Sequence, residues 1–243
     1  MILNKFIIKN LLSLLLSVAV IMTFEQAYSQ QDQDTANRSD EKGLKQGYWK
    51  KFDEGGLLKY EGRFIDDKPV GEFVYYYPDE TVKARSTFFD DGKGSFTTTF
   101  HHTGTKMTEG YYSGKDKDSI WKYYNSDGIL LKEEFYRNKM KEGALKTFFD
   151  NGQISDETNW KADKKEGCWK QYFPEGNLKL EGQYVNDQKQ GEFRYYFPSG
   201  KINIIGFYEA SVRTGEWLYM DENLKVTRKE TYDNGKLIKE ENF

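Results

Sequence analysis

The sequence predicts an all-β fold, an elongated and twisted antiparallel meander of about eight β-hairpin repeats of 24 residues each. The first observation is a phrase: GYWKKFDEGGLLKYEGRF at residues 47–64 returns as GCWKQYFPEGNLKLEGQY at residues 167–184, and this offset of 120 residues is five times 24. The second is composition, because a chain that is 16% aromatic and 31% charged favours strands over disorder. The third is the alternation of apolar and polar residues after each turn, which is the period of a strand.

Residues within a repeat are numbered by position, with the first residue as position 0. The phrase that opens a repeat occurs eight times, and the third repeat is expected to hold one extra residue. The openings are Gly47, Gly71, Gly94, Ser119, Gly143, Gly167, Gly191 and Gly215. Position 2 is large and apolar, position 15 is often glycine, and position 17 is aromatic. The residues predicted to have a structural role in the repeat are Trp49, Trp121, Trp169, Trp217, Gly62, Gly110, Gly182 and Gly206.

A turn signal, a glycine that follows a small polar residue in most repeats, separates the two strands of a hairpin. Two registers remain open. A two-residue turn pairs Trp169 with Gly182, and the indole then lies across a strand that has no side chain there. A three-residue loop pairs Tyr172 with Leu178 instead. The longer loop suits the repeats with proline at position 7, because proline lacks the N–H that a two-residue turn would use.

The 243-residue chain divides into three segments. Residues 1–29 are predicted to be a cleavable signal peptide, since two lysines precede an apolar run of 14 residues and small residues precede Gln30. That run is short for a membrane span, which favours cleavage over an uncleaved anchor. Residues 30–46 are predicted to be a flexible leader, and residues 47–243 the repeat array. The expected location is secreted or periplasmic.

The phrase G-x-W-K-x-Y-x-x-x-G-x-L-K-x-E-G-x-Y resembles the MORN-variant repeat of many bacterial proteins. Residues 47–64, 119–136 and 167–184 carry it best, and the resemblance covers about residues 47–243. It implies rows of β-hairpins that serve protein association, with phospholipid or membrane contact in some MORN proteins. Some bacterial variant-repeat proteins are antitoxin-like, but that role requires a cytoplasmic toxin and disagrees with a signal peptide.

Tyrosines occur on both faces of the predicted sheet, because adjacent residues of a strand point to opposite sides. They can form the core with their hydroxyl groups in water, or they can form a strip that binds a ligand. The candidates for such a strip are Tyr75, Tyr123, Tyr195 and Tyr219. Cations in the connectors between repeats could border it, namely Lys164, Lys165, Lys189 and Arg213.

Several classes of chemistry find no support in the sequence. The net charge of −3 offers no basic field for nucleic acid, and no nucleotide-binding loop or nucleophile-elbow phrase occurs. His101 and His102 are adjacent and make a poor metal pair, and the one cysteine, Cys168, is expected to be buried or inert. The recurring glutamates, such as Glu181, are expected to pair with the lysine two residues earlier. We expect no enzyme activity, catalytic residue, metal or cofactor.

The expected function is that of a non-catalytic exported repeat protein, a scaffold that binds an unidentified protein or a cell-envelope polymer. A first alternative is a module that binds a membrane surface or phospholipid, which the connector cations favour and the acidic net charge opposes. A second alternative is a glycan-binding module, because stacked tyrosines can cover the faces of sugars.

Overall fold

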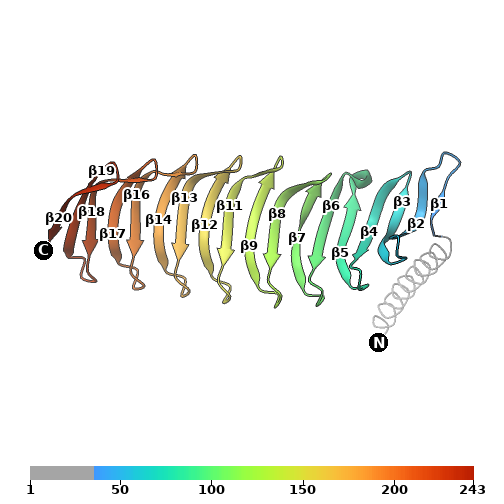
Figure 1. Ribbon diagram of the computed structural model, residues 1–243, viewed down its shortest axis with the longest axis horizontal. Coiled ribbons are helices and arrows are strands. Elements are labelled where there is room, and N and C mark those ends of the chain that lie inside the picture. The colour runs from blue at the N-terminus through green and yellow to red at the C-terminus, as the bar shows by residue number, and fades with distance from the viewer. Residues whose placement is uncertain (1–35) are drawn as a thin grey trace, which may run out of the picture. The chain divides into compact units, whose positions relative to one another are not determined.

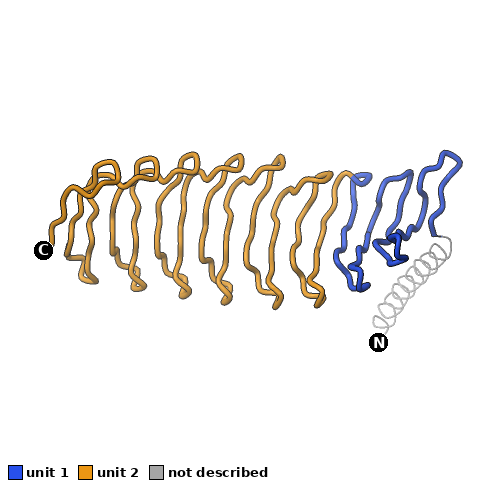
Figure 2. Tube along the Cα trace, viewed as in Figure 1, with its two compact units in different colours: residues 1–92 blue, residues 93–243 orange. Residues whose placement is uncertain are grey.

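The computed structural model describes residues 36–243, which form two compact units (Figure 2). The first unit ends at Gly92 and the second, here unit 2, runs from Lys93 to Phe243. The predicted signal peptide and the start of the predicted leader lie outside the described residues. No helix of the described residues is long and apolar enough to cross a membrane.

The first unit is a run of antiparallel strands in chain order, each paired with the next. Its elements are β1 (Arg38–Ser39), β2 (Lys45–Phe52), β3 (Leu58–Ile65), β4 (Lys68–Tyr76), β5 (Val82–Phe89) and the short 3₁₀ turn η1 (Asp90–Gly92). β1 pairs with β2, and the Trp49 indole N–H donates to the Arg38 carbonyl oxygen at 3.1 Å. The predicted leader over residues 30–46 therefore ends too late, since β1 and the start of β2 lie within it.

Unit 2 repeats the same pattern through six hairpin repeats and a last strand, and Figure 1 shows its hairpins side by side in chain order. Its strands are β6 (Gly94–Phe100), β7 (Lys106–Ser113), β8 (Asp116–Tyr124), β9 (Leu130–Arg137), β10 (Met140–Lys141), β11 (Gly143–Phe148), β12 (Ile154–Lys161), β13 (Lys164–Tyr172), β14 (Leu178–Val185), β15 (Gln188–Lys189), β16 (Gly191–Tyr196), β17 (Ile202–Glu209), β18 (Val212–Met220), β19 (Val226–Asp233) and β20 (Lys236–Asn242). The predicted fold class, an all-β antiparallel meander of hairpin repeats, is confirmed.

The two registers left open by the sequence occur together in one hairpin. Trp169 pairs with Gly182, but a bulge after Gln171 shifts the pairing by one residue, so that Tyr172 pairs with Leu178. The loop beyond has three residues, closed by a hydrogen bond from the Gly176 N–H to the Phe173 carbonyl at 2.8 Å. The same closure occurs in all eight repeats, with or without proline.

The third repeat corrects the predicted spacing. Thr97 pairs with Gly110, so Thr97 and not Phe96 stands at position 2. The repeat therefore starts at Ser95 and holds no extra residue. All eight starts are then spaced by 24 residues, and Ser95 joins Ser119 as an exception to the opening glycine.

The core is made of rings that lie over glycines of the preceding repeat. A Cβ atom added to Gly110 would lie 2.5 Å from the Trp121 indole, and one added to Gly182 would lie 2.5 Å from the Phe193 ring. One of the two open registers had the Trp169 indole lie over Gly182, its pairing partner, and the structure places the Phe193 ring there instead. Because the covering ring belongs to the next repeat, its contact with the glycine joins two hairpins. Each such ring contributes about 3–5 kcal/mol to the free energy of unfolding.

Candidate functional site

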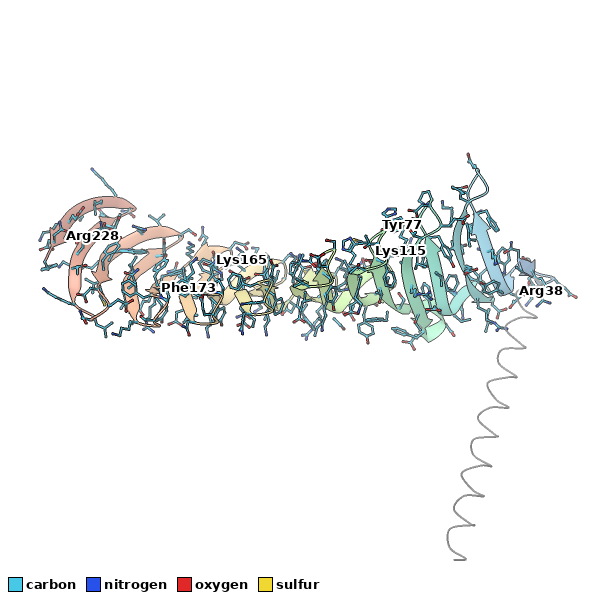
Figure 3. The ribbon with its side chains drawn as sticks, turned by 90° about the horizontal axis from the view of Figure 1, so that it is seen from below. Arg38, Tyr77, Lys115, Lys165, Phe173 and Arg228 are labelled. Atoms are coloured by element: carbon cyan, nitrogen blue, oxygen red, sulfur yellow. The ribbon has the colours of Figure 1, made fainter. Side chains whose placement is uncertain are left out.

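One face of unit 2, here called the core face, carries positions 2, 4, 13, 15 and 17 of each repeat. Paired residues share a face, so Trp121 lies beside Glu134, and Tyr123 lies beside Lys132. Figure 3 shows side chains on both sides of the ribbon, and no helix or second sheet of the described residues covers the core face. Its cations and all of its tyrosines except the buried Tyr184 are half-buried and remain accessible to a ligand.

The predicted tyrosine strip is interrupted in the structure. Position 4 holds Tyr123, Tyr195 and Tyr219 in unit 2 and Tyr75 in the first unit, and all four are half-buried. Between Tyr123 and Tyr195, however, the same position holds Thr147 and Gln171. The tyrosines therefore form separate groups on the core face, each within its own repeat.

A row of cations crosses the core face at intervals of 24 residues, each two residues before a repeat begins. Lys93 holds this place before the third repeat but is exposed, and the row discussed here consists of the five that follow, Lys117, Lys141, Lys165, Lys189 and Arg213. These cations lie over aromatic rings: the Lys165 Nζ is 4.9 Å from the centre of the Tyr184 ring, and the Lys189 Nζ is 5.0 Å from that of Tyr208. Each such contact contributes about 0.5–2 kcal/mol. Lys164, also predicted, is exposed and lies over no ring of the described residues.

The connectors hold this row in place. The Lys165 N–H donates to the Asp187 carboxylate at 2.8 Å, and the Asp187 N–H donates back to the Lys165 carbonyl at 3.0 Å. Asp187 belongs to a two-residue turn in which both residues have positive φ. The backbones of Lys141, Lys189 and Arg213 are likewise hydrogen-bonded to the turn that follows.

A buried glutamate interrupts the core face in the fourth repeat. Glu134 stands at position 15, where four of the other repeats have glycine, and its exposure is 3%. It accepts hydrogen bonds from the hydroxyl groups of Tyr123 at 2.6 Å and Tyr136 at 2.9 Å. The ammonium groups of Lys132 and Lys141 each lie 3.1 Å from the other carboxylate oxygen. Desolvation opposes its charge, but these donors outweigh it and lower the pKa of Glu134 to about 2.

The eighth repeat contains a second centre of the same construction. Glu230 is 6% exposed and accepts hydrogen bonds from Tyr219 at 2.5 Å and Tyr232 at 3.0 Å. Its cations are Arg228 at 3.3 Å and Arg213 at 3.8 Å. Desolvation again opposes the charge, and the tyrosine and arginine donors lower the pKa of Glu230. Two tyrosine hydroxyl groups and two cations therefore surround one carboxylate, twice in unit 2.

Neither glutamate was predicted as a site residue. The signal was present, because glutamate replaces glycine at position 15 in an otherwise regular repeat. The sequence alone does not place Glu134 between two tyrosines, since Tyr123 belongs to the opposite strand and Lys141 to a connector.

The recurring glutamates of position 14 lie on the other face and link neighbouring repeats. Glu181 accepts a hydrogen bond from Tyr196 of the next repeat at 2.5 Å and pairs with Arg194 at 3.4 Å. The predicted partner, the lysine two residues earlier, was wrong: Lys179 lies over the Phe173 ring instead. The structural role stands, with partners that come from neighbouring strands.

Cys168 also lies on the other face and is exposed, so burial, one of the two predicted alternatives, was wrong. It borders a shallow, open hollow with Lys170 and Glu192. His101 opens the hairpin loop of the third repeat, where its N–H donates to the Thr105 carbonyl. Among residues 36–243, no group of three or more histidine, cysteine or acidic side chains could hold a metal ion.

The sequence comparisons agree with this repeat geometry. A model of the MORN repeat variant matches residues 117–138, 141–162, 165–186 and 189–210, and no curated protein matches the chain. MORN repeats are a non-catalytic repeat type and are commonly modules that bind proteins or membranes. Residues 117–210 thus hold four consecutive MORN-variant repeats.

Proposed function

We propose that this chain is a non-catalytic, exported scaffold that binds another protein or a cell-envelope polymer through the core face of unit 2. The observation that supports this best is the row of cations over aromatic rings, held at fixed spacing. The aromatic rings under the row are of the kind enriched where proteins bind one another, and the row itself supplies positive charge that can match an acidic partner. Among the described residues no carboxylate forms an ion pair with Lys165 or Lys189, so their charge is available to a ligand.

The test reverses charge on one face at a time. A Lys165→Glu/Lys189→Glu variant alters the core face, and a Lys161→Glu/Lys164→Glu variant alters two exposed connector lysines by the same charge. We expect only the first variant to lose binding of a partner isolated from the native cell envelope. Equal loss in both variants, or in neither, would contradict a role for the core face.

The cation row also favours a membrane surface as ligand, because polybasic surfaces bind anionic lipid. Sedimentation with vesicles of phosphatidylcholine, with and without phosphatidylserine, separates this function from protein binding. A glycan array provides the corresponding test for sugars.

Export is the second part of the proposal and depends on the predicted signal peptide. Amino-terminal sequencing of the protein from its native cells should find a mature chain that begins near Gln30. An intact amino terminus in the cytoplasmic fraction would contradict it.

A further inference from the structure

The two glutamate centres show how the core face binds a carboxylate. In both, the hydroxyl groups of the tyrosines at positions 4 and 17 donate hydrogen bonds to the same carboxylate oxygen of the glutamate. Tyr123 and Tyr136 donate to Glu134, and Tyr219 and Tyr232 donate to Glu230. In both, one cation comes from position 13 and another from the cation row. The repeat therefore has a fixed donor set for one carboxylate group.

The seventh repeat has most of this donor set and no carboxylate of its own. Tyr195 stands at position 4 and Tyr208 at position 17, with Lys189 and Arg213 of the cation row on either side. Position 15 is Gly206, and the Trp217 ring covers it so closely that no side chain fits there. The other described repeats without an acid at position 15 lack one or both tyrosines.

The hydroxyl groups of the seventh repeat lie in a positive environment. Burial and the hydrogen bond to Tyr208 raise the pKa of Tyr195. Burial also acts to raise the pKa of Tyr208, but its hydrogen bonds with Tyr195 and Arg213 and the nearby Lys189 charge outweigh this and lower it. Arg213 is shared with Glu230 at 3.8 Å, whereas Lys189 forms no ion pair among the described residues. A donor set of this kind is electrostatically matched to an incoming anion.

We propose that Lys189, Tyr195, Tyr208 and Arg213 form a subsite for the carboxylate side chain of an acidic segment in a protein partner. This deepens the proposed function and rests on it. The choice of a carboxylate follows from the two internal examples, in which the tyrosines of positions 4 and 17 and a cation of the row hold a glutamate; the position-13 cation of both examples is replaced by Ile204 in the seventh repeat. Half-burial of all four side chains leaves them accessible to an external chain.

The experiment measures binding of a fluorescent hexaglutamate peptide to residues 30–243, with a hexaglutamine peptide for comparison. We expect the glutamate peptide to bind at least about fivefold more tightly than the glutamine peptide. Lys189→Met and Tyr208→Phe should each weaken glutamate-peptide binding by about fivefold, whereas Lys164→Met should change it by less than about twofold. Circular dichroism confirms that each variant folds.

Equal binding of both peptides, or equal loss in the Lys164→Met control, would overturn the subsite. Binding to phosphatidylserine vesicles without binding to the glutamate peptide would also overturn it and assign the cations to lipid. If the peptide does not bind but Lys165→Glu/Lys189→Glu still abolishes capture of the native partner, the subsite fails while the proposed function stands.

Discussion

Repeats four and seven place very different residues at position 15 of the same hairpin. In repeat seven it is Gly206, and the next repeat supplies Trp217, whose ring lies over the glycine. In repeat four it is Glu134, and the next repeat supplies the smaller Leu145 at position 2. The glycine is therefore required by the ring of the following repeat, and where that ring is missing the position is open to a charged side chain with its own partners.

Trp169 shows what happens when a ring follows a residue other than glycine. The preceding position 15 is Thr158, and Trp169 is only half-buried, whereas Trp121 and Trp217 are almost fully buried. Its indole N–H donates to the Asp156 carboxylate at 2.7 Å. The Trp169 ring, without a glycine beneath it, is thus less buried than Trp121 and Trp217 and donates to a carboxylate.

The largest loss of stability should come from a substitution that places a side chain in the space beneath a ring. Gly206→Val would displace Trp217 and destabilise unit 2 by about 3 kcal/mol or more, because backbone and indole leave no room for a side chain. Urea unfolding followed by tryptophan fluorescence measures this. Combination with Trp217→Leu should recover part of the loss, and full additivity of the two changes would contradict the packing described here.

Glu134→Gln tests how much the buried carboxylate of repeat four contributes to stability. The change leaves Lys132 and Lys141 close together without their carboxylate, and we expect a loss of about 2–3 kcal/mol in urea unfolding. Glu133→Gln is the matched control, since Glu133 is more exposed and pairs with Lys122 at 3.4 Å on the other face. It should cost less than about 1 kcal/mol. Similar losses in both variants would show that burial of Glu134 is unimportant.

The pH dependence of stability isolates the charge of Glu134. Its pKa of about 2 in the folded chain lies below the ordinary value of 4.5, so its stabilisation is present above pH 4.5 and disappears as the pH falls toward 2. The difference in unfolding free energy between wild type and Glu134→Gln should shrink by about 2 kcal/mol between pH 7 and pH 3. A constant difference over this range would show that the carboxylate is not specially stabilised.

The sequence was sufficient for the period and the strands, because these depend on contacts within one hairpin, but it left the pairing of Trp169 with Gly182 as one of two open registers. It was insufficient for the contacts between hairpins. Which ring covers Gly182 depends on how adjacent strands are offset by bulges, and the donors around Glu134 come from three separate segments. The sequence identified the tyrosines of position 4 as candidates. Only the structure shows that two of them donate to a buried glutamate.

The smallest expected change in stability concerns the first residue of repeats four and seven. Gly191 opens repeat seven with a φ of 79°, whereas Ser119 opens repeat four with a φ of 56°, a left-handed conformation that costs serine more than glycine. Ser119→Gly should therefore stabilise unit 2 by about 0.5–1 kcal/mol in urea unfolding. Ser95→Gly is the control, because Ser95 occupies the same position without positive φ and is buried. It should give no gain, and equal stabilisation by both changes would contradict strain at Ser119 as the cause.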